Sequence, residues 1–596
     1  MRYFIKISIV LLFLNFSLTG DIFSQEGFNK IQSDYQEGKI TLHEKIVREG
    51  YLLFQDRGKI EAEEIIKKKF PVKCGTGIIV GLKTYWKLLT EKEKRYFSYF
   101  FQRPVMQNQY ITPQGHFKIH YDTFGNNAIP LIDENNNKIY DYIEVAAEAF
   151  EKAFSFYTDT LGYNPPPSDN GIDGNEYDVY IENLGYGCYG ETYPEDVVPG
   201  TSEKSYYSYI KIHNNFNRGH YTKGYNGLRV TAAHELHHAI QLGYVQRYQD
   251  WYFYEITSTW FEDVVYDEIN DYYQYLPSLF DNLDRPFNTY NGKHEYGMSI
   301  WLHFLAKRFD INITREIWEK MSSEESIEAM DDALNDRGSS FSEEISRFSL
   351  WNYYTGSRAD TINFYEEGKF YPEVKINVNI TTFSDTSFSS SVKYLSSNYC
   401  LAEVPMVSKF NINAEDQYKQ TDVWRVWLIQ NDGEINLTNY KFDLKNKSFS
   451  DLSFTSYSEF TKLIFVPTVI EKNSNSLSSD GKYRINFKIH LSEPSKSKKN
   501  ILAGNFPNPF IPENYPKTNI PFILREKTDV EIRIFSSSGK LVKNMSFKNM
   551  NTGMYRNLCQ WDGKDNNGKP VSTGVYVCLL KTNSNTDKCK IVLIRK

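Results

Sequence analysis

The segment TAAHELHHAIQL, residues 231–242, places His234 and His238 four residues apart, with Glu235 directly after the first histidine. On a helix, residues four apart lie on one face about one turn from each other, so both imidazoles could bind one ion. Glu235 would lie beside that face, where it could accept a proton from a water on the metal. This HExxH pattern is typical of zinc hydrolases. His237 points to the flank, where packing or a hydrogen bond is expected rather than ligation.

A catalytic zinc ion binds three protein side chains and keeps its fourth position open. The candidates for the third ligand are Glu255 and Glu262, which are seven residues apart in DWYFYEITSTWFEDVVYDE. On one helix they would lie about 10 Å apart, so both cannot bind the same ion directly. We predict Glu255, because it lies early in its helix beside small residues that let two helices approach. Glu262 remains the alternative ligand; otherwise Glu262 or Asp263 would hold an imidazole N–H.

Peptide hydrolysis also requires a group that stabilises the developing oxyanion. The segment KHEYGMSIW offers His294 and Tyr296 at the start of a helix. Tyr296 is the predicted oxyanion donor. The alternative is that Tyr296 only packs beneath the active-site helix.

Residues 133–144, DENNNKIYDYIE, follow the spacing of a twelve-residue calcium loop. Loop positions one, three, five, nine and twelve carry side-chain oxygens and position seven offers a carbonyl; these six residues are Asp133, Asn135, Asn137, Asp141, Glu144 and, for the carbonyl, Ile139. Position six is normally glycine and here is Lys138, for which a positive φ costs about 1 kcal/mol. We predict Ca²⁺ at this loop, with an asparagine-rich turn that caps the next helix as the alternative.

The pattern along the chain indicates several domains, since 596 residues exceed one hydrophobic core. Residues 1–24 have the basic start, short apolar run and small polar end of a secretory signal peptide. Residues 25–105 are rich in Lys and Glu at helical spacing and form the predicted pro-region. Residues 106–375 mix helical and strand patterns. Residues 376–495 and 500–596 alternate as strands between polar turns, so the fold class is an α+β catalytic domain followed by all-β modules.

Two predicted helices of the catalytic domain are unusually clear. DYIEVAAEAFEKAFSFYTDTLGY, from Asp141, has the spacing of one long amphipathic helix, and YGMSIWLHFLAKRF, from Tyr296, that of one apolar helix. EYDVYIENLG alternates as a strand, and so does the region around GHFKIHYDTFG.

Composition excludes several classes of protein. Charged residues make up 24% and the net charge is -7, so no basic face for nucleic acid is expected. After the signal peptide no segment approaches about 18 consecutive apolar residues, so the mature chain should have no transmembrane helix. The six cysteines form no CxxC pair, which indicates neither a zinc ribbon nor a disulfide framework. Cys578 and Cys589 flank a polar turn and could pair across a hairpin.

The chain resembles a family of secreted bacterial proteins assigned as metalloproteases. The similarity lies between about residues 70 and 350, in the ordered segments GHFKIHYDTFG, DENNNKIYDYIE, YDVYIENLG, AAHELHHAIQLGY, WYFYEITSTWFED and YGMSIWLHFLAKRF. HELHH followed by EITSTWFE also resembles the gluzincin class of zinc peptidases. The resemblance implies a zincin-like fold, zinc ligands at His234, His238 and Glu255, and Glu235 as the general base.

PVKCGTG, residues 71–77, resembles the cysteine-switch segment of matrix metalloproteases. The resemblance implies that a Cys74 thiolate occupies the open position of the zinc and displaces the catalytic water. The alternatives are that Cys74 pairs with Cys188 or packs in a core.

The last ninety or so residues begin with NFPNPF and continue through VEIRIFSSSGKLV and WDGKDNNGKPVSTGVYVCLL. Their alternation predicts a small β-sandwich in which Trp561 covers one face of the core. The segment resembles the Ig-like domain of flagellar hook-capping proteins and the C-terminal sorting domains of the type IX secretion system. That resemblance implies an Ig-like sandwich, and the secretion machinery as a partner.

The sequence therefore favours a secreted zinc endopeptidase that acts on protein or peptide substrates, released or attached at the outer cell surface, with Zn²⁺ as cofactor and Ca²⁺ as a second ion. Two alternatives remain open. One is a catalytically silent surface-binding protein on the same scaffold, and the other is a zinc hydrolase of non-peptide substrates, because HExxH fixes the metal chemistry and not the substrate.

Overall fold

A computed structural model of the chain describes residues 27–54 and 72–595. Short gaps within this range fall at residues 169–170, 172, 202–203, 218, 382–384, 406–409, 417–422, 432–436, 445–448, 455–459, 472–481, 492–498, 503, 506–507, 514–515 and 556–557. The predicted signal peptide, residues 1–24, lies outside the described residues. No helix in the described part is long and apolar enough to cross a membrane.

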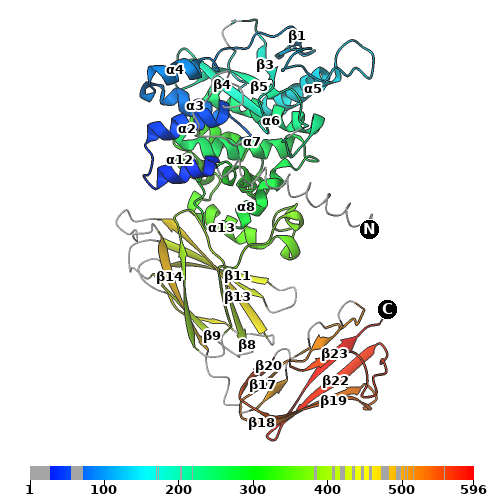
Figure 1. The fold of residues 1–596 in the computed structure, drawn as a ribbon. Coiled ribbons are helices and arrows are strands. Elements are labelled where there is room, and N and C mark those ends of the chain that lie inside the picture. The colour runs from blue at the N-terminus through cyan, green and yellow to red at the C-terminus, as the bar shows by residue number, and fades with distance from the viewer. Residues whose placement is uncertain are drawn as a thin grey trace.

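The chain is a multidomain α+β protein whose C-terminal part consists of β-sheets, as Figure 1 shows. A mixed five-stranded sheet with helices occupies the N-terminal part. From about residue 378 onward the described strands form sheets that are antiparallel except for the parallel pair of β6 and β8. The predicted fold class is confirmed at this level.

The mixed sheet has the strand order β1-β2-β3-β5-β4. Its strands are β1 (Asn108–Ile111), β2 (Phe117–Tyr121), β3 (Tyr177–Glu182), β4 (Gly190–Val197) and β5 (Tyr206–His213). β2, β3 and β5 are parallel, whereas β1 and β4 pair antiparallel with β2 and β5. β4 therefore forms one edge of the sheet, and the strands predicted from GHFKIHYDTFG and EYDVYIENLG are β2 and β3.

Helix α6 (Gly224–Tyr244) carries the HExxH segment and packs against β4, β5, α5 (Asp141–Ser155) and α7 (Trp251–Val265). Almost every residue from Leu228 to Leu242 is buried, because the sheet covers one side of the helix and other helices cover the rest. Small residues such as Ala232 let these neighbours approach closely. A helix enclosed on all sides holds its histidines inside the protein.

The two long predicted helices are both interrupted. The first is α5, which ends at Ser155 and continues as a wider π-helical turn, Phe156–Thr160. The second is divided into α9 (His294–Gly297) and α10 (Ile300–Arg308). Gly297 packs so closely on Leu279 that an added Cβ would lie 3.0 Å from the Leu279 Cβ, and α9 ends at this glycine.

The remaining helices surround this core. The C-terminal group is α8 (Leu276–Phe280), α11 (Ile313–Met321), α12 (Ser326–Asp336) and α13 (Phe341–Tyr353). The N-terminal group is α2 (Leu42–Phe54), α3 (Thr76–Thr84) and α4 (Glu91–Ser98). The N-terminal helices share a hydrophobic cluster with Tyr180, Tyr193 and Tyr209 of the sheet, so the described part of the predicted pro-region is packed against the mixed sheet.

The middle β-region is two sheets packed face to face, with strand orders β11-β10-β13-β8-β6 and β12-β9-β14-β7. Its strands are β6 (Val378–Thr381), β7 (Thr386–Val392), β8 (Cys400–Pro405), β9 (Phe410–Asp416), β10 (Val423–Asn431), β11 (Leu437–Leu444), β12 (Phe449–Phe454), β13 (Phe460–Glu471) and β14 (Tyr483–Leu491). Trp427 Nε1 donates to Ser346 Oγ of α13 over 2.8 Å, which joins this sandwich to the helical region.

The last β-region has its own core, and Trp561 is fully buried in it as predicted. Its sheets are β15-β17-β20, β16-β21 and β19-β18-β22-β23. Its strands are β15 (Ile501–Leu502), β16 (Thr518–Asn519), β17 (Phe522–Leu524), β18 (Thr528–Ser536), β19 (Leu541–Met550), β20 (Gly553–Tyr555), β21 (Gln560–Trp561), β22 (Gly574–Lys581) and β23 (Thr586–Leu593). Cys578 and Cys589 lie directly opposite each other on β22 and β23, both as free thiols.

Candidate metal centre

Four buried side chains from three segments converge on one point: Cys74 before α3, His234 and His238 on α6, and Glu255 on α7. One ligand atom from each lies within 4.8 Å of all the others. The two Nε2 atoms of the histidines are 3.1 Å apart, and Glu255 Oε2 lies 3.3 Å and 3.7 Å from them. Ligands of a tetrahedral zinc at its usual bond lengths lie about 3.3 Å from each other, so the spacing suits a small divalent ion.

The charges of this group also call for a cation. Glu255 Oε2 is buried and makes no hydrogen bond to any described residue, while Trp251 Nε1 donates to its Oε1 over 2.9 Å. Burial, together with the charges of Glu235 and Glu255, holds the pKa of the Cys74 thiol well above its usual range. A divalent ion would satisfy the Glu255 oxygen that lacks a hydrogen bond and would favour the thiolate of Cys74. The residues therefore fit zinc in both distance and chemistry.

Neighbouring side chains orient both imidazoles. Glu262 Oε1 lies 2.7 Å from His234 Nδ1, and Gln241 Oε1 lies 2.7 Å from His238 Nδ1, so both Nε2 atoms face the common point. Asp263, the other residue considered for this position, instead lies 3.7 Å from His303 Nε2. Glu255 and Glu262 thus approach opposite nitrogens of the same ring, which their separation of two helical turns allows.

His237 faces away from the group. Its Nδ1 lies 3.2 Å from Ser258 Oγ, and its ring packs against Phe261 and Trp318. Burial lowers the pKa of His237 well below its usual value, so the ring is neutral there. It packs as its angular position on the helix predicted.

Glu235 lies against strand β4 beside the ligand group. Its Oε2 accepts hydrogen bonds from Thr192 Oγ1 over 2.8 Å and from Thr76 Oγ1 over 3.1 Å. Burial raises the pKa of this carboxyl. Gly190 makes the approach possible, because a Cβ at that position would lie only 2.5 Å from Glu235 Cγ.

The segment that carries Cys74 lies along the free edge of β4. Gly75 N donates to Gly190 O over 3.2 Å, Tyr189 N donates to Lys73 O over 2.8 Å, and Cys74 pairs with Gly190 in parallel. Residues 73–75 therefore pair with the start of β4 through one isolated β-bridge, in the manner of a short added strand.

The side chain of Lys73 is buried on the far side of His234. Its Nζ lies 2.8 Å from Glu262 Oε2 and 2.5 Å from Asp271 Oδ2. Burial alone would lower the pKa of Lys73, but Asp271 and Glu262 outweigh it and raise the pKa above its usual value. Glu262 thus bonds the histidine and the lysine at once.

Of the two predicted oxyanion candidates, Tyr296 lies near the group and His294 does not. The ring centres of Tyr296 and His234 are 6.5 Å apart, and burial with the nearby Glu255 raises the Tyr296 pKa well above its usual value. His294 lies between Arg285 and Phe287, and burial lowers its pKa to about 3.

Sequence reasoning missed several residues that support the centre, namely Lys73, Thr76, Thr192, Gln241, Trp251 and Asp271. Most of them reach it from distant segments, so no local spacing signals them. Lys73 and Thr76 have one signal, since they flank Cys74.

The loop 133–144 brings most of its predicted ligands together at the surface. Asp133 accepts from the backbone N–H groups of Asn137 (3.1 Å) and Lys138 (3.0 Å), and the amides of Asn135 and Asn137 donate to Glu144 over 3.0 Å and 2.7 Å. Lys138 has φ 73°, the left-handed conformation that position six requires. Asp141 Oδ1 accepts from Glu134 N over 3.2 Å. Ile139 N donates to Asn137 Oδ1 over 2.8 Å.

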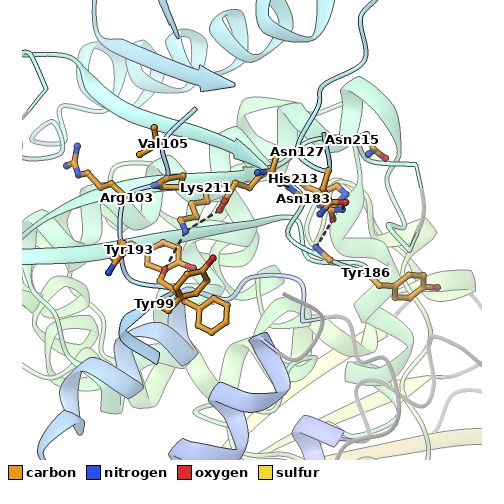
Figure 2. Close-up of a pocket in the computed structure, with 16 residues that line it drawn as sticks. Tyr99, Arg103, Val105, Asn127, Asn183, Tyr186, Tyr193, Lys211, His213 and Asn215 are labelled. Atoms are coloured by element: carbon orange, nitrogen blue, oxygen red, sulfur yellow. Dashed lines mark hydrogen bonds and ion pairs between the residues drawn. The ribbon is translucent and has the colours of Figure 1, made fainter. Parts of the chain in front are cut away.

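A separate open pocket of about 820 Å³ lies between residues 99–105 and strands β3 to β5 (Figure 2). Lys211 inside it is paired with Glu182 at 3.2 Å and reaches Phe100 O at 3.5 Å. No member of the metal-binding group lines this pocket, so the chemistry described above does not take place there.

No family model and no curated protein matches the chain. Many solved structures overlap parts of it, among them three bacterial proteins. PorZ, a surface component of the type-IX secretion system of Porphyromonas gingivalis, is 19% identical over 20% of this chain and 14% of its own, with a TM-score of 0.13. Latent PorU from the same organism is 9% identical over 37% and 32%, with a TM-score of 0.15. A β-glucuronidase of Parabacteroides merdae is 11% identical over 31% and 25%, with a TM-score of 0.13. The matches span about a third or less of these proteins and carry no argument about function.

Proposed function

We propose that the protein is a secreted zinc-dependent endopeptidase, made in a latent form in which residues 73–76 close the active site. The observation that carries the proposal is the added strand. Beside the buried His234, His238 and Glu255, the edge of β4 binds a stretch of polypeptide.

The side chains supply what peptide hydrolysis needs. A zinc ion bound there would polarise the scissile carbonyl and activate the attacking water. Glu235, held by the Thr192 hydroxyl, would take the proton of that water and pass it to the leaving amine. Glu262 and Gln241 hold the imidazoles in place, and Tyr296 would donate a hydrogen bond to the oxyanion.

The edge strand favours a peptide over a non-peptide substrate. An unpaired strand edge recognises an extended main chain through its own N–H and C=O groups, whatever the side chains. The order of an edge strand, an HExxH helix and a second helix with Glu255 supports a zincin-like catalytic fold. The presence of Glu235 together with the ligand group weighs against a catalytically silent scaffold.

The same segment accounts for latency. Cys74 stands in the ligand group, where its thiolate would fill the position of the catalytic water, and Thr76 bonds to Glu235. Val105, between α4 and β1, is 98% exposed, so the chain can be cut at the end of the predicted pro-region.

Export and sorting complete the proposal. The signal peptide would direct the chain out of the cell, and the Ig-like region at 500–596 would be read by the secretion machinery, which leaves the enzyme released or attached at the outer surface. Its separate core supports an independent module that takes no part in the chemistry.

Calcium at the loop 133–144 belongs to the same proposal as a stabilising ion. The left-handed Lys138 and the convergence of Asp133, Asn135, Asn137 and Glu144 support it. The loop leads directly into α5, which packs on the HExxH helix.

The test uses the full chain with the recognition site of a specific protease placed at Val105. Zinc content is measured first, and cleavage of casein and of a peptide library is then followed before and after the cut. The cut should raise cleavage, and Glu235→Gln should keep the zinc but lower kcat by about 100-fold or more. Zinc without Glu235-dependent peptide cleavage would contradict the proposal and favour the silent or non-peptide alternatives.

Inhibition by Cys74, which we call the latch, is tested separately with a variant of that residue. In the uncut chain, Cys74→Ser should cleave faster than wild type, because a hydroxyl is a far weaker zinc ligand than a thiolate. Equal activity of the two uncut chains would exclude Cys74 as the inhibitory ligand while leaving the peptidase intact.

A further inference from the structure

The pocket that holds the side chain of Lys73 is built for a cation. Nζ lies between the carboxylates of Glu262 and Asp271, and the rings of Tyr189, Tyr275 and Tyr296 face it at 5.4, 5.4 and 5.6 Å. Two carboxylates and three aromatic faces form the usual recognition surface for an ammonium group.

Residues other than Lys73 keep this pocket in shape. Asp271 accepts hydrogen bonds from Thr222 Oγ1 and Gln274 Nε2, and Glu262 is bonded to His234. The carboxylates of Glu262 and Asp271 should therefore stay in place when residues 73–76 leave the active site. Two buried carboxylates without a cation are costly, so the emptied pocket would strongly favour a new positive charge.

The pocket also lies beside the reaction centre. Glu262 connects Lys73 Nζ to the imidazole of His234, and Lys73 directly precedes Cys74, which stands in the ligand group. The backbone of the two residues follows the β4 edge, where a substrate would also bind. The residue that fills this pocket is therefore the neighbour of the residue at the metal.

We propose that Lys73 occupies a substrate subsite, formed by Glu262, Asp271 and the three tyrosines, that receives a lysine or arginine flanking the scissile bond. The inference rests on the proposed peptidase function and adds its substrate class. Asp271 is then the residue that determines specificity, because Glu262 also serves the histidine. If the pocket bound only Lys73 of the inhibitory segment and no substrate side chain, cleavage sites would show no preference for lysine or arginine.

The first test profiles cleavage sites by mass spectrometry on a peptide library, using the chain cut at Val105. Lysine and arginine should flank the cut bonds, and Asp271→Asn should lower kcat/KM for lysine peptides by on the order of 10- to 100-fold, with much less effect on leucine peptides. Asp178→Asn, which alters a buried and paired carboxylate on β3, is the matched control and should leave the preference unchanged. Cleavage with no basic preference, or a preference that Asp271→Asn leaves intact, would overturn the inference and leave the peptidase standing.

The second test needs no catalysis. In the full chain, Lys73→Ala removes the equivalent of n-propylammonium, and adding that amine should raise the melting temperature of the variant by several degrees in a saturable manner. n-Propanol should not raise it, and wild type should respond to neither compound. If neither wild type nor any variant cleaves peptides, the proposed function fails. The melting-temperature measurement then tests by itself whether the Lys73 pocket binds a cation. Equal effects of amine and alcohol would overturn it as a cation subsite.

Discussion

Two clusters of described residues combine histidine with acidic groups at metal-binding spacing. One is Cys74, His234, His238 and Glu255, and the other is the cluster of His120, Asp173 and Asp178. The two differ in residue type, in burial and in the charged side chains around them.

In the second cluster the protein supplies the positive charge itself. Arg103 pairs with Asp178, His120 Nε2 lies 2.7 Å from the same carboxylate, and Lys118 lies 3.5 Å from Asp173. A metal ion would have to displace these partners. In the first cluster Glu255 Oε2 makes no hydrogen bond to any described residue, and the imidazoles 3.3 Å and 3.7 Å from it are those that would bind the same ion. A candidate metal site thus differs from an ion-pair network in that its carboxylate faces the side chains that would share the ion, and not an arginine or a lysine.

The largest effect should come from removing a ligand. His238→Ala should weaken zinc binding by more than about 100-fold, because a residue that binds the metal directly contributes more than one that hydrogen-bonds to a ligand. Asp178→Asn should leave zinc content unchanged. Zinc affinity of both variants is measured by chelator competition followed by elemental analysis. Equal loss of zinc in the two would contradict the assignment of zinc to the first cluster rather than the second.

A smaller effect should follow from the residues that orient the ligands. Glu262→Gln should weaken zinc binding by about 10- to 100-fold, because it removes the charge that holds His234. Asp263→Asn, at the next position of α7, should have no effect since Asp263 faces His303. Competition titrations compare them, and a stronger effect of the Asp263 variant would show that the wrong carboxylate has been assigned.

The smallest effect concerns the exposed loop 133–144, an oxygen-only site unlike the buried centre. Millimolar Ca²⁺ should raise the melting temperature of wild type by a few degrees and leave zinc content unchanged. Glu144→Ala should abolish the shift, whereas Glu148→Ala, one turn further along α5 and exposed, should keep it. A shift that survives in the Glu144 variant would place calcium elsewhere.

Local spacing predicted much of this molecule. His234, Glu235 and His238 follow from a single helical turn, and the strands of the β-regions follow from patterns of a dozen residues or fewer. Calcium at the loop 133–144 stays a prediction. The sequence left two candidates for the third ligand, Glu255 and Glu262, on one helix. In the structure α7 packs against α6 so that Glu255 lies near the Nε2 atoms of both histidines.

What the sequence could not predict depends on distant contacts. Lys73 and Asp271 are 198 positions apart, and Thr76 and Glu235 are 159 apart, so neither pair has a spacing to recognise. The helical spacing also did not predict the π-helical turn after Ser155, or the break after Gly297, where Leu279 packs closely on the glycine. The pairing of residues 73–75 with β4 is likewise visible only in three dimensions.

X-ray absorption at the zinc edge of the full, uncut chain tests directly whether Cys74 binds one zinc ion together with His234, His238 and Glu255. The account predicts one sulfur ligand at about 2.3 Å and nitrogen or oxygen ligands at about 2.0–2.1 Å, with the sulfur lost in Cys74→Ser. Zinc coordinated by nitrogen and oxygen alone in the intact chain, or no bound zinc, would contradict it.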